Sequence, residues 1–322
     1  MKTFADISLK PYNTFSIDSK VRRLIVFEPG DDIPPLEGNV LLLGGGSNVV
    51  FTKDYDGTVI TLSHSSNQAI ILSSNLVTVW AGMVMDDLVQ WTLDNGLYGL
   101  ENLSAIPGTV GASAVQNVGA YGAEAKDFIE SVEAYDLQER RMCTFSNADC
   151  KFAYRDSLFK HHPGRYLILR VTYCLSPEYV PNLSYKALEG LPHATAQQLR
   201  NAITDLRWSK LPRPEEHGSA GSFFKNPLVD EGTYTRIKAQ YTDMPDAHKT
   251  NDGYKLSAGW LIDRAGWKGK TMGRAGVWPN NALVLYNTGA CTGNEVVALA
   301  QAIVADVQTK FGITLEPEAI II

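Results

Sequence analysis

Hydrophobic residues in the first 80 positions come in short runs separated by turn residues, a pattern typical of β-strands. The runs expected to form strands are Arg23–Phe27, Val40–Leu43, Thr58–Leu62 and Leu76–Trp80. Further along, apolar and more polar residues alternate over Leu167–Leu175, which predicts a half-buried strand.

A helical pattern follows the fourth run. Apolar side chains recur at i, i+3, i+4, i+7 and i+8, at Met85, Leu88, Val89, Thr92 and Leu93. Asp86 and Asp87 favour the first turn of a helix, and Gly96 is placed to end it. We therefore expect a helix that begins near Met85 and ends before Gly96.

A polar, proline-interrupted stretch over Leu206–His217 predicts a domain boundary. Beyond it, helical and strand patterns alternate. The expected elements are a helix over Lys255–Ala265, a strand over Ala282–Asn287, a helix over Asn294–Phe311 ended by Gly312, and a final strand over Thr314–Ile322. Pro317 lies within that last strand and favours an edge position or a bulge.

Composition narrows the class of protein. The 322 residues predict two or three domains at roughly 150 residues each, and a net charge of −6 argues against broad binding of nucleic acid or an anionic membrane. No apolar run approaches the roughly 18 residues of a membrane span, and Asp6 and Lys10 interrupt any signal peptide. We expect a cytoplasmic protein with reduced cysteines and no metal site.

The first glycine-rich segment follows a strand pattern and contains Gly44, Gly45, Gly46, Ser47 and Asn48. Successive glycines can direct several backbone N–H groups at one anion, such as a pyrophosphate. The segment matches neither GxGxxG nor a P-loop, so it does not support a Rossmann site or an NTPase. Taken alone, it fits a tight turn between strands equally well.

The second glycine-rich segment runs from Gly96 to Gly122 and holds six glycines in 27 residues, with Glu101 as its only charge. Such a stretch fills a core poorly and lacks the charges of a solvated loop. It fits a backbone that passes close to a flat buried ligand, while a tight contact between helix and sheet is the structural alternative.

Several motifs together carry a family resemblance. They are GGGSN, the run GLENLSAIPGTVGASAVQNVGAYG, FAYRDS, GSAGSFFKNP, KLSAGWLID and the terminal LEPE. In this order, from Asn13 to Glu318, the chain resembles the UDP-N-acetylenolpyruvoylglucosamine reductases, FAD- and NADPH-dependent enzymes of bacterial peptidoglycan synthesis. The stretch Val180–Leu211 resembles the longer of the family's two types, which carries a tyrosine-bearing loop over the substrate.

The resemblance implies an α+β fold. A two-part FAD-binding module of the vanillyl-alcohol-oxidase (PCMH) type would occupy residues 1–62 and 63–205. A smaller α/β substrate-binding domain would follow over 206–312, and a C-terminal strand over 313–322 would carry a catalytic glutamate. The predicted boundary near residue 206 agrees with this division.

The resemblance also implies a non-covalent FAD site. Gly44, Gly45, Gly46, Ser47 and Asn48 would hold the pyrophosphate, and the residues along the flavin and its ribityl chain would be Ile106, Gly108, Ser113, Asn117, Gly119 and Tyr121. NADPH would reduce the FAD and leave. The enolpyruvyl sugar nucleotide would then accept hydride at its methylene carbon and become UDP-N-acetylmuramate.

That reaction leaves negative charge on the adjacent carbon, delocalised into a carboxylate, so it needs a cation or strong donor and a proton source. By resemblance, Arg155 would hold the carboxylate, Glu318 would hydrogen-bond the enolate and Ser222 would deliver the proton. Each has a structural alternative: Arg155 as a surface pair with Asp156, Ser222 as a turn hydroxyl, and Glu318 as a charge that protects an edge strand.

The resemblance also offers assignments for the substrate. They are Tyr154, Tyr185, Lys210, Asn226, Lys255, Lys268 and Asn281. Lysines suit a diphosphate, although solvated surface lysine is the structural alternative. Many members of the long-loop type have Arg two residues after the catalytic Glu, where this chain has Ile320. Arg264 or Arg274 is the candidate to replace it.

Two other functions remain open from the residues alone. A flavin oxidase on the same FAD module would keep the glycine-rich segments but has no reason to keep YRDS, GSFFKNP and EPE together. A non-catalytic protein that binds sugar nucleotides would lack the flavin. For the reductase we expect a monomer whose partners are the enolpyruvyl sugar nucleotide and NADPH, with no nucleic acid or membrane partner.

Overall fold

The structure, a computed structural model, describes residues 1–64 and 70–322 and divides into two compact units. The first unit comprises Met1–Ile7, Val21–Gly46 and Tyr55–Arg207, and the second comprises Ser8–Lys20, Ser47–Asp54 and Trp208–Ile322. The chain enters the second unit for the last time between Arg207 and Trp208, which lies within the boundary region predicted at Leu206–His217. The four-part division expected from the sequence stays a prediction.

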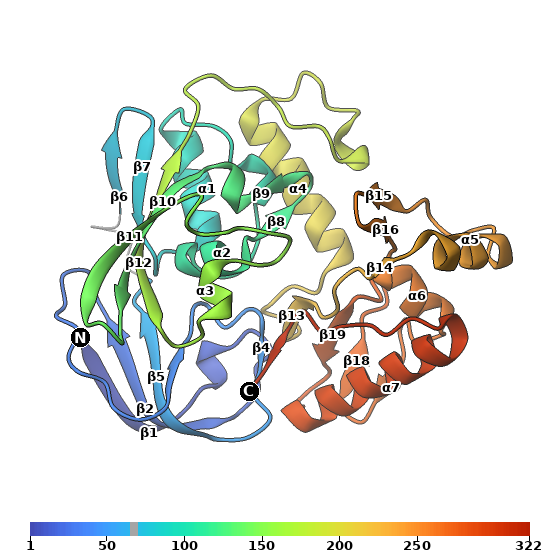
Figure 1. Ribbon diagram of the computed structural model, residues 1–322, viewed down its shortest axis with the longest axis horizontal. Coiled ribbons are helices and arrows are strands. Elements are labelled where there is room, and N and C mark those ends of the chain that lie inside the picture. The colour runs from blue at the N-terminus through green and yellow to red at the C-terminus, as the bar shows by residue number, and fades with distance from the viewer. Residues whose placement is uncertain (65–69) are drawn as a thin grey trace. The chain divides into compact units, whose positions relative to one another are not determined.

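Two sheets build the first unit (Figure 1). One has the order β1-β2-β5-β3, with the strands Lys2–Ser8, Lys20–Phe27, Tyr55–Leu62 and Val40–Leu42. The other is antiparallel in the order β11-β10-β12-β7-β6, with the strands Arg141–Ser146, Ile129–Asp136, Tyr166–Cys174, Leu76–Trp80 and Ile70–Ser73. In the first sheet, β2 and β3 both pair with β5 in parallel.

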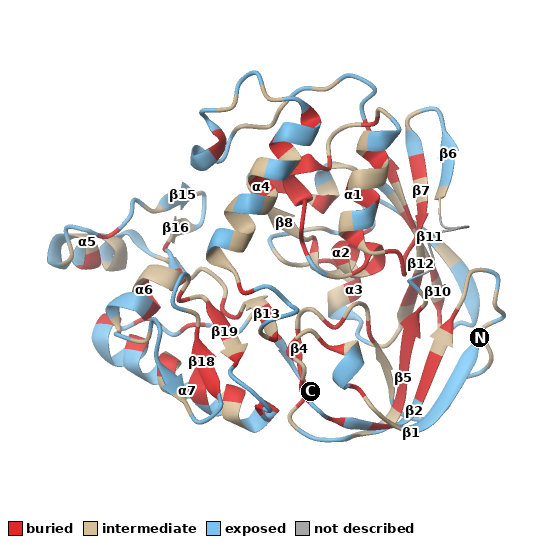
Figure 2. Ribbon diagram, turned by 180° about the vertical axis from the view of Figure 1, so that it is seen from behind, coloured by how far each residue is buried: buried red, intermediate tan, exposed pale blue. Residues whose placement is uncertain are grey.

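Helices and short elements complete the first unit. They are α1 (Met85–Asp94), α2 (Val110–Gln116), α3 (Leu158–His161), α4 (Ala196–Lys210), the hairpin of β8 (Gly119–Ala120) and β9 (Ala123–Glu124), and 3₁₀ turns at Glu101–Leu103, Ala125–Asp127 and Lys186–Leu188. Apolar residues of α1, α2 and the five-stranded sheet share one buried cluster. Figure 2 shows the buried residues along β5, β10 and β12.

The second unit holds smaller sheets. Its four-stranded antiparallel sheet has the order β13-β19-β18-β17, with the strands Ser219–Ser222, Val284–Asn287, Ala275–Val277 and Thr271–Met272. A three-stranded sheet joins β14 (Leu228–Val229), β16 (Gly253–Lys255) and β15 (His248–Thr250), and β20 (Ile320–Ile321) lies parallel to β4 (Val49–Val50). The helices are α5 (Glu231–Gln240), α6 (Ala258–Arg264) and α7 (Gly293–Phe311), after a 3₁₀ turn at Lys10–Tyr12.

Several sequence predictions are confirmed. The strand at Leu76–Trp80 has the predicted bounds, and α1 and β12 lie where the periodicity places them. Helix α7 begins with a capping box between Thr292 and Glu295 and ends at Gly312, whose φ of 73° is left-handed.

Two predicted elements are corrected. The helix expected from Lys255 begins at Ala258, because Lys255 pairs with both neighbouring strands and the Ser257 hydroxyl caps the helix. The strand expected over Thr314–Ile322 is confined to Ile320–Ile321. The backbone before it pairs instead with residues 223–225, and Pro317 has no N–H for a continuous ladder.

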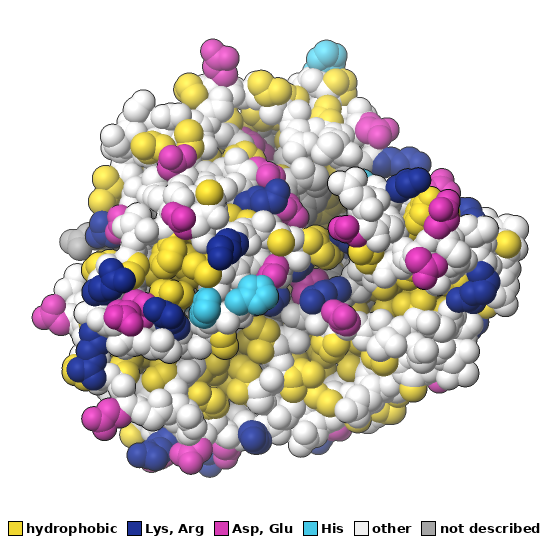
Figure 3. Space-filling model, in the orientation of Figure 1, with side chains coloured by type: hydrophobic (Ala, Val, Ile, Leu, Met, Phe, Trp, Pro, Cys, Tyr) yellow, Lys and Arg dark blue, Asp and Glu magenta, His cyan; other side chains and the backbone are white. Residues whose placement is uncertain are grey.

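Within the described ranges, no helix is long and apolar enough to cross a membrane, and no three His, Cys, Asp or Glu side chains gather as a metal site requires. On the face shown in Figure 3, basic and acidic side chains are interspersed.

Candidate functional site

The two glycine-rich segments contact each other in the first unit. A Cβ atom on Gly44 would lie 2.8 Å from the Cβ of Ala112, and one on Gly45 would lie 2.8 Å from the Cα of Gly108. Real Cβ atoms do not approach other atoms so closely, so side chains at both positions would force the segments apart. The absence of side chains at Gly44 and Gly45 therefore lets the two segments pack directly against each other, as the structural alternative of a tight contact also requires.

The first segment divides at its end. Gly46 is left-handed, with a φ of 62°, and belongs to the first unit, whereas Ser47 and Asn48 belong to the second. The side-chain amide of Asn48 donates to the carbonyl oxygen of Glu318 at 3.1 Å. Asn48 therefore supports the segment that carries a predicted catalytic residue, in addition to its predicted place at the pyrophosphate.

Two predicted flavin residues are held by internal hydrogen bonds. The Ser113 hydroxyl donates to the carbonyl oxygen of Val110 at 2.7 Å. Asn117 is fully buried and left-handed at the end of α2. Its amide donates to the Ala153 carbonyl oxygen at 2.9 Å and to the Glu124 carboxylate at 3.1 Å, and its Oδ1 accepts the backbone N–H of Lys126 at 3.0 Å. These side chains hold the local backbone in place.

Tyr121 lies at the tip of the β8–β9 hairpin, and the hairpin holds it in a left-handed conformation with a φ of 50°. Its ring contacts that of Tyr185 edge-on, with the centroids 5.0 Å apart. The amide of the buried Asn102 donates to the carbonyl oxygens of Tyr121 and Asn182, at 2.7 and 2.9 Å. The structure thus brings together two predicted tyrosines, one from the second glycine-rich segment and one from the long loop.

Arg207 is a site residue that the sequence did not single out. Its positive charge interacts with the Tyr121 side chain, and its Nε donates to the carbonyl oxygen of Ala105 at 3.1 Å. Burial raises the pKa of Tyr121 despite this neighbouring charge. Helix α4, which carries Arg207, runs into the polar stretch that predicts a boundary, and so its helical register was not recognised.

Glu101, the one charged residue of the second glycine-rich segment, is buried. Both of its carboxylate oxygens accept the backbone N–H of Gly99, at 3.2 and 2.9 Å. Burial nevertheless raises the pKa of this carboxyl. The residue stabilises the turn that precedes the flavin segment.

Arg155 and Asp156 both form hydrogen bonds with groups other than each other. The Asp156 carboxylate bonds the His161 ring at 2.7 Å, while the Arg155 guanidinium donates to the carbonyl oxygens of Gly119 at 2.5 Å and Asn117 at 3.4 Å. Arg155 has a left-handed φ of 54° and is half-buried, with its guanidinium over the exposed ring of Tyr154. A strained turn therefore places this cation against the predicted flavin segment.

Ser222 ends β13 in the second unit. The register between Ser219 and Ser222 is interrupted at Gly221, whose φ of 67° is left-handed. Such a bulge redirects the side chain that follows it. No residue in the described part of the chain hydrogen-bonds the Ser222 hydroxyl, which is half-buried. This hydroxyl is not the bonded turn hydroxyl of the structural alternative.

Glu318 lies on the segment that pairs with the residues after Ser222. Its backbone N–H donates to the carbonyl oxygen of Phe223 at 2.8 Å, and the N–H of Lys225 donates to Glu316 at 2.9 Å. The backbone thus brings Ser222 and Glu318 together within the second unit. The two glutamates differ in exposure. Glu318 is half-buried, whereas Glu316 is exposed and forms an ion pair with Lys225 at 3.4 Å.

Both arginines considered as replacements for the absent one at Ile320 have other carboxylate partners. Arg264 pairs with Asp243 and Arg274 with Glu295. The exposed Ile320 instead pairs with β4 through its backbone. The suggestion that one of these arginines assists Glu318 is therefore not supported by their contacts.

Two of the predicted substrate residues hold backbone in the second unit. Asn226 Oδ1 accepts the N–H of Ala258 at 3.0 Å, and Asn281 Oδ1 accepts the N–H of Leu283 at 3.1 Å. The Leu283 carbonyl oxygen in turn accepts the N–H of Phe223 at 2.8 Å. Asn281 therefore lies one turn away from the segment that carries Ser222.

The predicted lysines differ in their surroundings. Lys268 forms an ion pair with Asp263 at 3.3 Å, with both side chains substantially exposed. Such an exposed pair contributes little to stability. The surroundings of Lys268 are therefore those of a solvated surface lysine, which is the structural alternative given above. Lys210 ends α4 and Lys255 ends β16, and both have interaction partners in the structure.

The cysteines have no place in the site. All four are free thiols, and burial raises the pKa of Cys150 to about 12 and that of Cys291 to about 11. A thiol with so high a pKa is a poor nucleophile at neutral pH.

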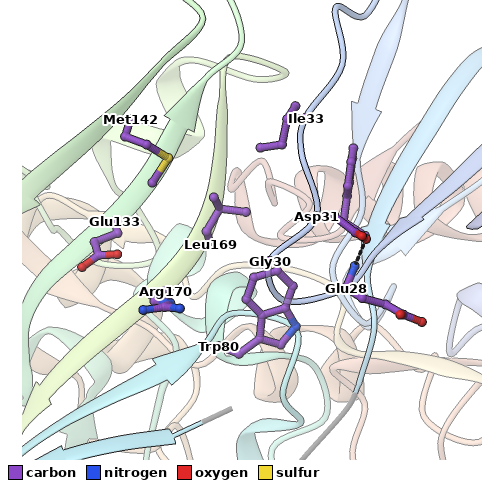
Figure 4. A pocket seen from close by; sticks show the side chains of 10 residues that line it. Glu28, Gly30, Asp31, Ile33, Trp80, Glu133, Met142, Leu169 and Arg170 are labelled. Atoms are coloured by element: carbon purple, nitrogen blue, oxygen red, sulfur yellow. Dashed lines mark hydrogen bonds between the residues drawn. The ribbon is translucent and has the colours of Figure 1, made fainter. Parts of the chain in front are cut away.

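A cavity of about 200 Å³ in the first unit is separate from the predicted residues (Figure 4). Its ten lining residues include Trp80, Glu133, Leu169 and Arg170, and none of the predicted flavin or substrate residues. Glu133 and Arg170 are cross-strand neighbours of β10 and β12. The cavity is a gap beside the five-stranded sheet, and neither glycine-rich segment lines it.

Comparisons with known proteins agree with this geometry. A family model described as an FAD binding domain matches residues 36–141, and one described as the C-terminal domain of UDP-N-acetylenolpyruvoylglucosamine reductase matches residues 213–322. Together they include both glycine-rich segments, Ser222 and Glu318.

Relatives of similar length carry the same name. The UDP-N-acetylenolpyruvoylglucosamine reductase of Pseudomonas putida is 43% identical over 327 residues, covering 97% of this chain and 96% of the relative. That of Neisseria gonorrhoeae is 42% identical, covering 96% and 94%. The crystal structure of the reductase from Thermus caldophilus matches with a TM-score of 0.71 and 24% identity, covering 100% and 99% of the two chains. The expected α+β fold with an FAD-binding module is confirmed.

Proposed function

The chain belongs to the UDP-N-acetylenolpyruvoylglucosamine reductase family, and we propose that it reduces UDP-N-acetylglucosamine enolpyruvate to UDP-N-acetylmuramate in peptidoglycan synthesis, with FAD as cofactor and NADPH as reductant. One observation carries the proposal for the reacting groups. An unbonded serine hydroxyl, Ser222, lies on a backbone segment that is hydrogen-bonded to the segment of Glu318.

When bound, FAD supplies the hydride acceptor and donor of the reaction. The residues that would hold it are the glycines at 44–46 with Ser47 and Asn48 at the pyrophosphate, and Ile106, Gly108, Ser113, Asn117, Gly119 and Tyr121 along the rest. Gly44 and Gly45 pack against Ala112 and Gly108 of the second segment, so the two sets of predicted residues lie next to each other, as one cofactor site requires. Arg207 joins the set through its contacts with Tyr121 and Ala105.

Arg155 would hold the carboxylate of the enolpyruvyl group. A planar guanidinium can donate two parallel hydrogen bonds to a carboxylate, and the charge stabilises the electron density that the carboxylate gains. The strained turn at Arg155 and its bonds to Gly119 and Asn117 fix the position of this cation before a substrate arrives.

Ser222 would donate its proton to the carbon next to the carboxylate. A serine hydroxyl is a weak acid, but a carbanionic carbon is a strong base, so placement of the hydroxyl is sufficient. Because Ser222 has no hydrogen-bond partner among the described residues, its proton is available for this transfer. Glu318 would hydrogen-bond the growing enolate.

The substrate would also contact Tyr154, Tyr185, Lys210, Asn226, Lys255, Lys268 and Asn281. Lys210 and Lys255 suit the diphosphate as mobile charges, and Tyr185 is exposed enough to cover a bound nucleotide. Lys268 is the least supported because it already pairs with Asp263.

An anaerobic titration tests the proposal. The purified yellow protein is reduced with one equivalent of NADPH, the enolpyruvyl sugar nucleotide is added, and the flavin spectrum is followed. Return of the oxidised spectrum in step with formation of UDP-N-acetylmuramate is expected. A colourless protein would support the non-catalytic alternative, and fast reoxidation by O₂ without sugar nucleotide would support the oxidase.

Arg155→Lys separates a role at the substrate from a structural one. Lysine keeps the charge but cannot form the bidentate contact, so reoxidation by substrate should slow about 100-fold while reduction by NADPH changes little. Stopped-flow measurement of the two half-reactions checks this. Equal losses in both would indicate that Arg155 only holds the Gly119 segment.

A further inference from the structure

Ala105 has a costly backbone conformation directly before the predicted flavin residues. Its φ is 55° and it is buried, with 7% of its surface exposed. Alanine avoids the left-handed region because its Cβ meets the following carbonyl oxygen, and it has no polar side chain to compensate. Other groups must therefore hold this residue in place.

Two charged side chains from different helices bind the peptide groups of Ala105. Asp86 of α1 accepts the N–H of Ala105 at 2.6 Å through Oδ1. Arg207 of α4 donates from Nε to the Ala105 carbonyl oxygen at 3.1 Å. Both hydrogen-bonding groups of the strained residue are therefore bound by ionic partners, which form stronger hydrogen bonds than neutral ones.

A third residue orients Asp86. Arg200 precedes Arg207 on the same helix, α4. It donates from Nη1 and Nη2 to the two carboxylate oxygens of Asp86 at 2.5 and 3.0 Å, and from Nε to Gln90 at 2.8 Å. Burial alone would raise the pKa of Asp86, but the bonds from Arg200 and Ala105 lower it. Asp86, Arg200 and Arg207 are therefore linked to Ala105 through one set of hydrogen bonds.

The next residues are fixed from the other side. The carbonyl oxygen of Gly108 accepts the N–H of Met85 at 3.0 Å, and the N–H of Val110 donates to Met83 at 2.9 Å. Only Ile106 and Pro107 therefore lie between two fixed points, Ala105 and Gly108. The conformation of Ala105 decides the direction in which the chain enters this short span.

We propose that Asp86 is a positioning residue for the cofactor: held by Arg200, it keeps Ala105 left-handed and so sets the backbone of Ile106–Gly108 against the flavin. This inference rests on the proposed function, because it assumes that FAD lies along that span. Asp86 acts through the backbone and touches no reacting atom. An ordinary ion pair between α1 and α4 would stabilise the fold without this effect.

A rescue experiment on the holoenzyme distinguishes the two roles. Asp86→Ala should weaken FAD binding about tenfold, as the left-handed penalty of alanine implies, and shift the absorption bands of the bound flavin. Adding Ala105→Gly should restore affinity and spectrum, because glycine adopts a φ of 55° without cost. FAD affinity is read from fluorescence titration of apoprotein, and unfolding is followed separately.

Asp136→Ala is the matched control. Asp136 also lies in the first unit, where it is buried while Asp86 is half-buried; it holds Arg165 with bonds of 3.0 and 2.8 Å and accepts the backbone N–H groups of Gln138 and Glu139. It should lower the melting temperature as much as Asp86→Ala does, with no change in FAD affinity. Should Asp86→Ala not fold, Asp86→Asn keeps the acceptor for Ala105, loses the charge and should weaken FAD binding less than about threefold.

Each outcome decides the question. Equal loss of FAD affinity in the Asp86 and Asp136 variants, or failure of Ala105→Gly to rescue, would overturn the positioning role while wild-type turnover leaves the proposed function intact. A wild-type protein that binds no FAD would overturn both. If Asp86→Asn has to replace Asp86→Ala, a loss of FAD binding that Ala105→Gly does not rescue would likewise overturn the positioning role of Asp86.

Discussion

The two units hold their predicted site residues in opposite ways. In the first unit, Ser113, Asn117 and Arg155 are engaged with neighbouring backbone carbonyl oxygens. In the second unit, the Ser222 hydroxyl has no partner among the described residues, although the N–H and the carbonyl oxygen of the adjacent Phe223 are both hydrogen-bonded. In the first unit, these side chains therefore fix the local backbone. In the second unit, the backbone beside Ser222 is fixed and the serine hydroxyl itself is unbonded.

The difference fits the roles proposed above. A large flat cofactor is bound through backbone and shape, so side chains near it can serve to fix the chain. The proposed proton donor must keep its proton available, which fits a hydroxyl that is left unbonded on a fixed strand. Four predictions, ordered by the size of the expected effect, test this comparison.

The largest effect is expected for Ser222→Ala. Substrate-dependent reoxidation should slow by about 10²- to 10⁴-fold, the usual contribution of a positioned acid, while reduction by NADPH and the melting temperature stay near wild type. Stopped-flow absorbance and thermal unfolding check both parts. A variant with normal turnover would remove Ser222 from the reaction, and a large loss of stability would mean that its hydroxyl has a structural partner.

Asn117→Ala should chiefly lower the stability of the fold, whereas Ser222→Ala should chiefly slow the reaction. The loss of three buried hydrogen bonds and of a left-handed cap should cost about 3 kcal/mol in the free energy of unfolding, measured by urea denaturation. Asn117→Gly keeps the cap conformation and should be about 1 kcal/mol more stable than the alanine variant. A stable Asn117→Ala protein that turns over poorly would instead indicate that this side chain contacts the cofactor or the substrate.

Gly44→Ala should weaken FAD binding and cost about 1–3 kcal/mol in stability, because the added methyl group meets Ala112 and Thr109. Gly190→Ala is the matched control, since nothing lies within 4 Å of a Cβ at that position. Isothermal titration of the two apoproteins with FAD makes the comparison. If the two variants bind FAD equally well, the close approach of the glycine segments is irrelevant to the cofactor.

The smallest effect concerns the second unit at low pH. Bonds from Arg274 and Thr292 lower the pKa of Glu295 to about 2, from an ordinary value of 4.5. A lowered folded-state pKa gives stability that is present above about pH 4.5 and is lost as the pH falls toward 2. Glu295→Gln should flatten this part of the profile of melting temperature against pH, and Arg274→Met should do so too. An unchanged slope in both variants would contradict the assignment.

Much of the fold could be predicted because periodicity and turn residues are local. Leu76–Trp80, α1 and the end of α7 at Gly312 follow from side-chain alternation, helical spacing and glycine. Helix α4 was missed because its polar face and its overlap with the boundary stretch obscure the pattern. The final strand was overestimated because its partner, residues 223–225, lies almost 100 positions earlier.

The predicted site shows the same limit. Glycine content and motif order indicated the flavin segments, Arg155, Ser222 and Glu318, since those residue types carry the chemistry. The His161 partner of Asp156 and the Asp243 partner of Arg264 depend on which rings and carboxylates are nearby in space, so the sequence alone could not identify them. Arg207 was missed because nothing in its local sequence separates it from any arginine on a helix.

The sequence by itself determined the family, the strands and helices with strong periodicity, and the residue types that the reaction needs, because each of these is written in nearby positions. Only the tertiary structure decided that the two glycine-rich segments touch, that Glu318 pairs beside Ser222 and that Asp86 and Arg207 bind a strained alanine. These contacts join residues that are far apart in the chain, and packing and hydrogen bonding select them only when the whole chain has folded.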